Sequence, residues 1–220
     1  MAILVIDVGG THIKLRLQGR DEVRKAASGP TMMPHEMIVK VRAATEDWLF
    51  DRVTIGYPGP VVDGAILKEP VNLGQGWVGF DFASSLRCPV KIINDAAMQA
   101  LGSYEGGRML FLGLGTGLGN ALVFNHFLVP MELGHLPYKK GKTFEEYVGQ
   151  AGMKRLGRRK WQDAVFDVVA RLRNAFLADY VVLGGGNVKK MDELPPLCRM
   201  GDNRNAFLGG LRVWEQGPAV

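Results

Sequence analysis

Two glycine-rich turns carry the residue types best suited to binding phosphate. Each is expected to join two strands, and together they comprise Gly9, Gly10 and Thr11 in IDVGGTHIK and Gly115, Thr116 and Gly117 in LGLGTGLGNAL. Turns of this kind present backbone N–H groups that no side chain shields, and such groups bind phosphate oxygens. We predict that both turns contact phosphate, as does the later run Gly184, Gly185 and Gly186, which follows an apolar segment.

Charged side chains accompany only the first turn. Asp7 precedes it and Lys14 follows it, whereas the corresponding positions of the second turn are Leu112 and Gly119. A lysine supplies positive charge to a phosphate, and a carboxylate beside phosphate suits a Mg²⁺ ion, which takes carboxylate, water and phosphate oxygens. Asp7 is therefore the predicted Mg²⁺ ligand, directly or through water.

Neither turn matches the usual nucleotide-binding loops. The sequence contains no GxxxxGK[ST] motif. The first glycine turn leads into an expected strand, whereas a Rossmann dinucleotide site needs a helix at that point. The predicted phosphate site therefore belongs to neither of those folds.

A candidate for proton transfer, Asp95, lies in the segment INDA. It follows the short buried strand predicted at residues 90–93 and opens an expected helix, so a rigid element would hold its carboxylate. Such a group could accept the proton of a hydroxyl that attacks phosphate. It could instead cap the helix, because Asp and Asn side chains accept bonds from free amides at helix starts. The residues alone leave both roles open.

Hydrophobic periodicity predicts alternating strands and helices in both halves of the chain. The predicted strands lie at about residues 2–8, 12–18, 21–27, 51–57, 90–93, 108–114, 117–124, 127–130 and 180–183. The predicted helices lie at about residues 35–50, 94–101, 143–156, 161–178 and 205–214. Residues 70–82 contain too many glycines for regular structure and are predicted to form a binding loop.

The order of elements restarts after residue 105, which indicates two domains. A chain of 220 residues has room for two units of about 100 residues each. The boundary is predicted in the polar, glycine-rich segment SYEGGR. The predicted domains are residues 1–105 and residues 106–204.

The composition indicates a globular protein. Hydrophobic residues make up 47% of the chain and charged residues 22%, which is ordinary for a packed domain. We recognise neither a signal-peptide core nor an apolar stretch that could span a membrane, so we expect a cytoplasmic location and no membrane partner. Cys88 and Cys198 have no partner at metal-binding spacing, and both are expected to be reduced thiols.

Most of the net charge of +5 comes from one segment. Residues 139–160 include eight basic and two acidic residues. Concentrated positive charge favours an anionic partner such as nucleic acid, a membrane surface or a polyanionic substrate. The same charges could belong to a solvated helix face, and the sequence leaves both interpretations open.

Seven motifs resemble, in order, those of the ROK family of sugar kinases, and especially its polyphosphate-glucokinase branch. They are IDVGGTHIK, GYPGPVVDG, PVNLGQGWVGFDF, INDAAMQALG, LGLGTGLGNAL, ELGHLPY and VVLGGGN. They extend over roughly residues 3–190, nearly the whole chain. The resemblance implies a two-lobed, actin-like (ribonuclease H-like) α/β fold with a cleft between the lobes. In that fold a helix near residues 205–216 completes the N-terminal lobe.

The resemblance also implies an activity. It is phosphoryl transfer from ATP or inorganic polyphosphate to a hexose hydroxyl, most simply glucose to glucose 6-phosphate, with Mg²⁺ as cofactor. Asp95 would be the general base, and the residues implied to bind the sugar are Asn94, Asp95, Glu132, His135 and Glu145. Glu146 competes with Glu145 for the last position. Asn72, in the glycine-rich loop, is a further candidate, and a homodimer is a family expectation.

One departure from the family concerns metal. Most members carry a CxCGxxGCxE segment that holds a structural zinc, where this chain has PYKKGKTF at residues 137–144, without cysteine. We therefore expect no zinc. The basic segment 139–160 would suit a linear polyanion, which favours polyphosphate as a donor, alone or alongside ATP.

Other functions are compatible with parts of the sequence. A kinase for another hexose or for an acylated amino-sugar would have the same fold. A non-catalytic sugar-binding regulator is disfavoured, because repressors of this family carry a helix-turn-helix before the first strand, which is expected here from residue 3. A nucleic-acid-binding module would explain the basic segment, but no stacking array or groove-reading motif accompanies it, so no specific nucleic acid is expected.

Overall fold

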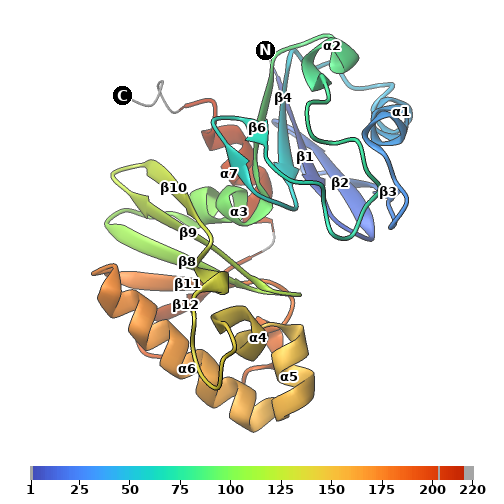
Figure 1. The fold of residues 1–220 in the computed structure, drawn as a ribbon. Coiled ribbons are helices and arrows are strands. Elements are labelled where there is room, and N and C mark those ends of the chain that lie inside the picture. Colours follow the sequence, from blue (N-terminus) through green and yellow to red (C-terminus); the bar gives the residue numbers. More distant parts are fainter. Residues whose placement is uncertain (1, 203, 216–220) are drawn as a thin grey trace. The chain divides into compact units, whose positions relative to one another are not determined.

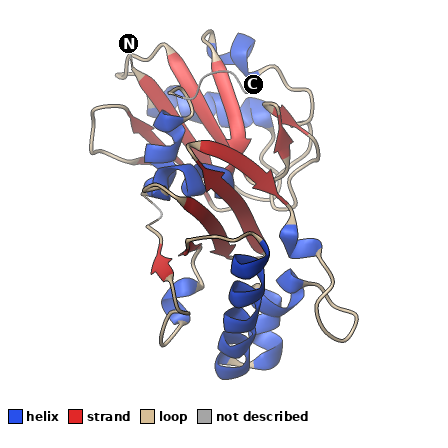
Figure 2. Ribbon diagram, turned by 90° about the vertical axis from the view of Figure 1, so that its left-hand side faces the viewer, coloured by secondary structure: helices blue, strands red, loops and turns tan. Residues whose placement is uncertain are grey.

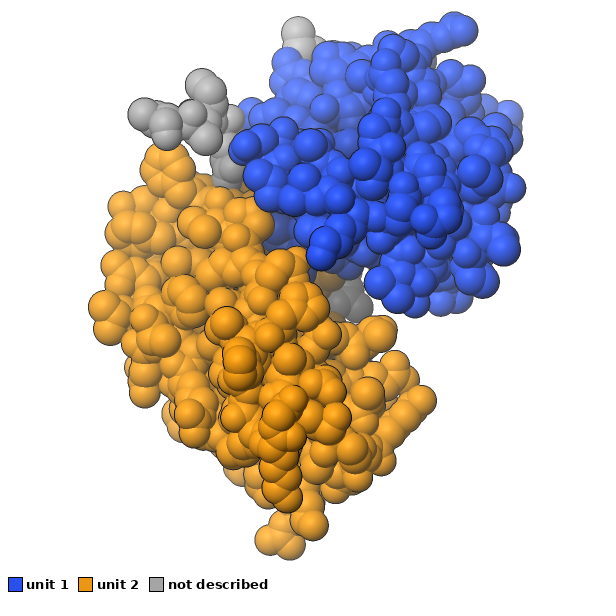
Figure 3. All heavy atoms as spheres, in the orientation of Figure 1, with its two compact units in different colours: residues 1–98, 206–220 blue, residues 99–205 orange. Residues whose placement is uncertain are grey.

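The computed structural model describes residues 2–202 and 204–215. The chain divides into two compact units, which Figure 3 draws in different colours. Unit 1 is Met1–Met98 with Ala206–Val220, and unit 2 is Gln99–Asn205. The division falls inside helix α3 (Asp95–Ser103), before the polar segment predicted as the boundary.

The sheet of unit 1 has five strands in the order β3-β2-β1-β4-β7 (Figure 1). They are β1 (Ile3–Val8), β2 (His12–Leu17), β3 (Arg24–Ala27), β4 (Arg52–Tyr57) and β7 (Val90–Asn94). The first three strands pair antiparallel, whereas β4 runs parallel to β1 and β7 runs parallel to β4. The carboxyl ends of β1, β4 and β7 therefore meet at one edge of the sheet, where the first glycine turn and Asp95 follow.

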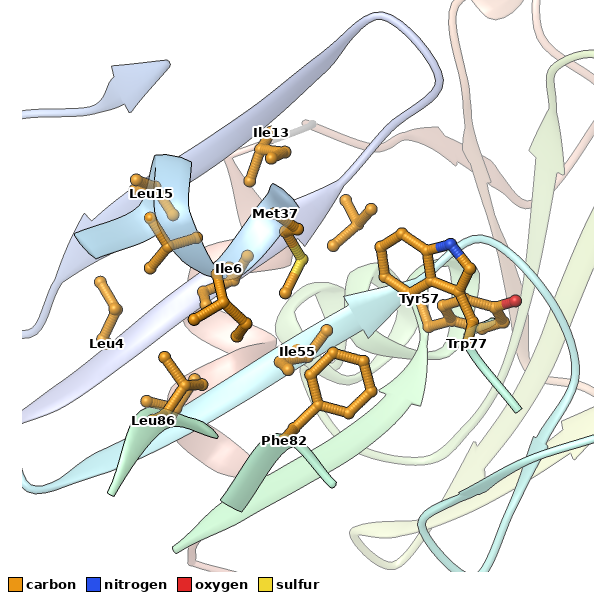
Figure 4. Close-up of a cluster of buried hydrophobic side chains, with 14 of the residues drawn as sticks. Leu4, Ile6, Ile13, Leu15, Met37, Ile55, Tyr57, Trp77, Phe82 and Leu86 are labelled. Carbon is orange, nitrogen blue, oxygen red and sulfur yellow. The ribbon is translucent and has the colours of Figure 1, made fainter. Parts of the chain in front are cut away.

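Successive side chains of β1 point to opposite faces of the sheet. Each face is covered by a hydrophobic cluster of its own. One cluster joins the strands to α1 (Pro34–Ala44) and α2 (Phe82–Leu86). Its members include Leu4, Ile6, Ile55, Met37, Trp77, Phe82 and Leu86 (Figure 4). The other cluster joins β1 to α3 and α7 (Asn205–Arg212) and comprises Ile3, Val5, Met98, Ala206 and Phe207. Helix α7 is thus part of the core of unit 1.

Unit 2 repeats this arrangement. Its strands are β8 (Arg108–Leu114), β9 (Leu118–Phe124), β10 (Phe127–Met131), β11 (Tyr180–Gly184) and β12 (Cys198–Met200). They have the order β10-β9-β8-β11-β12, and the directions of pairing match those of unit 1 strand by strand. The two glycine turns occupy equivalent places, between β1 and β2 and between β8 and β9.

Helices cover one face of the second sheet, as the blue ribbons of Figure 2 illustrate. They are α4 (Phe144–Val148), α5 (Gln150–Leu156) and α6 (Arg158–Ala175), with short 3₁₀ turns η1 (Leu133–His135) and η2 (Val188–Lys190). The core of unit 2 includes Leu110, Leu112, Val181 and Leu183 of the strands and Trp161, Val165, Val168 and Leu172 of α6. These apolar residues of α6 recur at helical spacing, as the sequence predicted.

Several element boundaries differ from those predicted. The helix predicted over residues 35–50 ends at Ala44, where the Thr45 hydroxyl bonds the Val41 carbonyl. The last predicted helix also ends earlier, at Arg212. The hairpin of β5 (Val61–Val62) and β6 (Ala65–Ile66), helix α2 and strand β12 were not predicted, because each is too short to show periodicity.

The helix predicted over residues 143–156 is broken into α4 and α5 at Gly149. This residue is extended, with φ −75° and ψ −179°. A Cβ at Gly149 would lie 2.6 Å from the Thr116 carbonyl oxygen, and the Gln150 amide donates to the carbonyls of Gly115 and Thr116. The break therefore lets the second glycine turn pack against the helices.

Of the helices that the structure describes, none has the length and apolarity needed to cross a bilayer.

We expect Gly210→Ala to destabilise unit 1. A Cβ at Gly210 would collide with the Val5 side chain, which is β-branched and buried and cannot swing aside. Overpacking of this kind costs about 1–3 kcal/mol, so the melting temperature should fall by several degrees. Gly29→Ala is the control, because a Cβ there meets no atom within 4 Å. Equal melting temperatures for the two variants would contradict the packing of α7 described above.

Candidate active site

Asp7 and Lys14 form an ion pair at the end of the first hairpin. They are directly opposite each other in the β1–β2 register, and Lys14 Nζ lies 2.8 Å from Asp7 Oδ2. The Asp7 side chain is 11% exposed and the Lys14 side chain 37%. The strand pairing thus positions a nearly buried carboxylate and a more exposed ammonium group beside the turn.

The turn itself is closed by backbone bonds. The Gly9 amide donates to the His12 carbonyl, and the Ser28 amide and hydroxyl bond the carbonyls of Thr11 and Gly9. A Cβ at Gly10 would lie 3.0 Å from Asn72 Cβ, so the glycine-rich loop predicted over residues 70–82 packs closely on the first glycine turn. Asn72 itself is exposed.

The glycine-rich loop has its own anchors. Glu69 accepts bonds from the amides of Trp77 and Val78, at 3.0 and 3.2 Å. The Trp77 side chain is fully buried and contacts the rings of Tyr57 and Phe82. These contacts hold the loop, and therefore Asn72, against the turn. The sequence predicted the loop but not Glu69, whose partners lie eight and nine residues away.

Asp95 is the first residue of α3, directly after β7. Asn94 caps this helix, because its Oδ1 accepts bonds from the amides of Ala96 and Ala97, and its Nδ2 donates to the Gly59 carbonyl. The Ala96 amide also lies 2.8 Å from Asp95 Oδ1. Capping is thus carried largely by Asn94, which leaves the second oxygen of Asp95 for other chemistry.

The electrostatics of Asp95 suit proton transfer. Burial, and then the negative charge of Asp7, raise the pKa of Asp95 to about 7, while the Ala96 amide and the Lys14 charge oppose the rise. A carboxyl group with a pKa near neutrality can both accept and release a proton at physiological pH. Perturbed groups of this kind cluster at functional sites.

The residues around Asp7 fit a Mg²⁺ ion. Mg²⁺ is commonly bound through one or two carboxylates together with water and substrate phosphates, so a complete protein cage is not required. Asp7 supplies a hard oxygen donor next to the predicted phosphate turn, and Asp95 adds negative charge nearby. Within residues 2–202 and 204–215, no group of three or more His, Cys, Asp or Glu side chains has metal-binding geometry.

In unit 2 the second and third glycine turns lie side by side. A Cβ at Gly185 would lie 2.5 Å from the Leu114 carbonyl oxygen, and the φ of Gly185 is +84°. Asn187 links the turns, since its backbone amide donates to the Leu114 carbonyl and its Nδ2 donates to the Gly115 carbonyl. Asn187 was not predicted as a site residue, although it ends the motif VVLGGGN. Residues 115–117 thus lie beside Gly185, whereas Gly184 is a buried residue of β11.

The three predicted sugar-binding residues of unit 2 also come together. His135 Nε2 lies 3.6 Å from Glu132 Oε2, and His135 Nδ1 lies 3.5 Å from Glu145 Oε1. Glu145 is next to the second glycine turn, because a Cβ at Gly117 would lie 2.5 Å from Glu145 Oε2. An imidazole between two carboxylates offers paired donors and acceptors of the kind that sugar hydroxyls require.

The neighbour of Glu145 has a different role. Glu146 forms a capping box with Thr143 at the start of α4 and an ion pair with Lys142. Its carboxylate is therefore occupied by local structure. Of the two glutamates between which the sequence could not decide, Glu145 is the one beside His135.

Partners within the chain neutralise part of the basic segment. Lys139 pairs with Asp167, Lys142 with Glu146 and Arg158 with Asp192, and Arg155 donates to the Glu146 carbonyl. The other four cations are exposed: Lys140, Lys154, Arg159 and Lys160. Two of these lie in the first turn of α6, which begins after Gly157 without a side-chain cap or an acidic residue.

Solved structures with the same fold define the class of protein. The inorganic polyphosphate/ATP-glucomannokinase of Arthrobacter sp. strain KM is similar with a TM-score of 0.80 and 23% identity, over 98% of this chain and 99% of that one. A ROK family glucokinase from Streptomyces griseus, solved with glucose and AMPPNP, is similar with a TM-score of 0.75 and 18% identity, over 99% and 100%. The predicted actin-like α/β fold is confirmed.

The chain belongs to the ROK family, whose model matches residues 3–154. A polyphosphate glucokinase of Mycobacterium tuberculosis is 30% identical over 158 residues, which are 65% of this chain and 59% of that protein. An N-acetylmannosamine kinase of Escherichia fergusonii is 31% identical over 139 residues, 56% of this chain and 47% of that protein. The chain thus spans about half of the length of these relatives, and the resemblance inferred from the motifs is confirmed.

We expect Asp95→Asn to stabilise the protein at high pH. Between pH 3.8 and about 7 the folded protein holds a proton on Asp95 that the unfolded chain has lost. The free energy of unfolding therefore falls as the pH rises through this range. The amide of the Asp95→Asn variant cannot ionise and avoids the loss, which amounts to roughly 1–4 kcal/mol at pH 8.

Thermal unfolding of parent and variant between pH 5 and 8, in a chelator, measures this difference. The variant should melt several degrees higher at pH 8, and the difference should shrink toward pH 5. A variant that melts lower than the parent at pH 8 would show that ionised Asp95 is stabilised by its surroundings.

Proposed function

We propose that the protein transfers a phosphoryl group to a hexose hydroxyl, most simply converting glucose to glucose 6-phosphate. The observation that carries the proposal is Asp95, a carboxyl group with a pKa of about 7 beside the Asp7–Lys14 pair. Membership of the ROK family supports it, as do the activities in the names of the relatives.

Each residue set has a role in this reaction. Asp95 accepts the proton of the attacking hydroxyl, while Glu132, His135 and Glu145 bind other hydroxyls of the sugar, with Asn72 and Asn94 as further contacts. The glycine turns bind phosphate oxygens through backbone amides, and Thr11 and Lys14 add a hydroxyl and a positive charge. Asp7 would hold Mg²⁺, directly or through water, and the ion would neutralise charge on the phosphates.

An activity assay tests this function. Purified protein, Mg²⁺ and glucose are incubated with ATP or with polyphosphate, and hexose 6-phosphate is measured. Asp95→Ala should lower kcat by about 10²–10⁴-fold, because a general base contributes that much. Asp21→Ala, which removes a fully exposed carboxylate, should leave kcat unchanged. Folded parent protein that forms no sugar phosphate with either donor would refute the proposal.

The same assay with other sugars tests a second substrate class. Similarity to an N-acetylmannosamine kinase supports an acylated amino-sugar as the alternative acceptor. A panel of glucose, mannose and N-acetylmannosamine separates the two. A non-catalytic sugar-binding regulator is the third alternative, and it would bind a sugar without turnover.

The donor is proposed to be polyphosphate, ATP or both. The exposed cations Lys154, Arg159 and Lys160 support polyphosphate. Arg159 and Lys160 lie in the first turn of α6, where positive charges are unfavourable without an anion because that end of a helix is itself positive. The names of two relatives include polyphosphate, and that of one also includes ATP. A homodimer and a cytoplasmic location stay predictions.

We expect the triple variant Lys154→Gln, Arg159→Gln and Lys160→Gln to bind long polyphosphate more weakly. Its KM for polyphosphate should rise roughly 3- to 30-fold, because each exposed charge contributes up to about 1 kcal/mol, while its KM for ATP should change less than about twofold. A matched variant removes three exposed cations of unit 1, Arg20, Lys68 and Arg87. An equal rise in the matched variant would mean that net charge, not this surface, is responsible.

A further inference from the structure

The 3₁₀ turn that carries Glu132 and His135 has an unusual cap. Glu132 is the N-cap residue of η1, but its side chain makes no capping bond. The first amide of the turn, that of Leu133, instead donates to Asn120 Oδ1 at 3.2 Å. A residue from β9 therefore holds the start of η1, where the N-cap residue Glu132 supplies no side-chain bond.

Asn120 is well placed for this task. Its side chain is buried, with 4% of the residue exposed, whereas the Glu132 side chain is 58% exposed. Asn120 lies opposite Met131 in the β9–β10 register, and Met131 directly precedes Glu132. The bond from the Leu133 amide to Asn120 fixes the backbone directly after Glu132. The Glu132 carboxylate makes no capping bond within η1, so its oxygens can accept bonds from a ligand.

The same side chain is tied to the second glycine turn. Asn120 Nδ2 donates to the Leu118 carbonyl at 2.9 Å, and Leu118 directly follows Gly117. The Leu118 carbonyl oxygen would also lie 3.1 Å from a Cβ at Gly134, within η1. Asn120 thus connects the start of η1 to the strand that leaves the predicted phosphate turn.

We propose that Asn120 is a positioning residue for sugar binding, which acts by holding the start of η1, and with it Glu132, through the Leu133 amide. The inference rests on the proposed function, because it assigns the Glu132 carboxylate to a sugar hydroxyl. Without Asn120, the start of η1 loosens and the contact of Glu132 with sugar weakens. The donor site stays unchanged, because the Gln150 amide and the Asn187 side chain still bond Gly115 of the second glycine turn.

Hydrogen exchange of the protein without ligands tests the cap itself. In Asn120→Ala, amides in residues 131–136 should exchange at least about fivefold faster than in the parent. The control is Thr54→Val in unit 1, since Thr54 is equally buried and also makes two hydrogen bonds, to the Gly210 carbonyl and from Trp214 Nε1. Unchanged exchange in residues 131–136 of Asn120→Ala would overturn the proposal.

Steady-state kinetics test the consequence for sugar. Asn120→Ala should raise the sugar KM about tenfold and change the donor KM less than twofold, and Thr54→Val should change neither. Asn120→Asp keeps an acceptor for the Leu133 amide but loses the donor to Leu118, so its sugar KM should fall between those of parent and Asn120→Ala. Equal rises in the sugar and donor KM, or a sugar KM of Asn120→Ala equal to that of the parent, would overturn the role.

The two experiments also separate this inference from the proposed function. If the folded parent protein phosphorylates no sugar, the proposed function fails, and the sugar-binding role of Asn120 fails with it even when exchange in residues 131–136 is faster. If the parent is active and the variants keep its sugar KM, only the inference about Asn120 fails.

Discussion

The ion pair of Asp7 and Lys14 is the interaction on which the proposed chemistry depends. Lys14 is paired with Asp7 across the β1–β2 hairpin, and the charges of both reach Asp95 at the end of β7. Because the carboxyl ends of β1, β4 and β7 meet at one edge, residues from two distant parts of the sequence, the first hairpin and the end of β7, share one field. Burial is the larger cause of the raised pKa of Asp95, the negative charge of Asp7 adds to it, and the positive charge of Lys14 limits the rise.

The same architecture serves a different purpose in unit 2. Its hairpin has no counterpart of Asp7 or Lys14, and its glycine turn instead packs closely on α4 and α5 and on the loop after β11. Such close packing requires residues without side chains, which explains the glycines at positions 117, 149 and 185. Of the two hairpins, the one in unit 1 thus carries an ion pair, and the one in unit 2 carries closely packed backbone.

The fold and part of the site could be predicted because their signals are local. Apolar periodicity, glycine turns between strands, and Asp95 directly after an apolar strand all appear within a few residues of sequence. Asn120 and Asn187 could not be predicted, since the bonding partners of their side chains lie up to 13 and 72 residues away, and either could be an ordinary polar residue. Lys139 likewise pairs with Asp167, 28 residues away, so part of the positive charge of the basic segment is neutralised by a partner that the sequence did not indicate.

The composition of unit 1 from two separate segments has a consequence for biosynthesis. Residues 99–205, which form unit 2, are contiguous, so this unit can fold as soon as it leaves the ribosome. The sheet of unit 1 is translated earlier and Met98 of α3 can cover part of it, but Ile3 and Val5 are fully covered only when Ala206 and Phe207 arrive. For the time needed to translate all of unit 2, the nascent chain therefore carries a partly uncovered apolar sheet face, which is the kind of surface that chaperones bind.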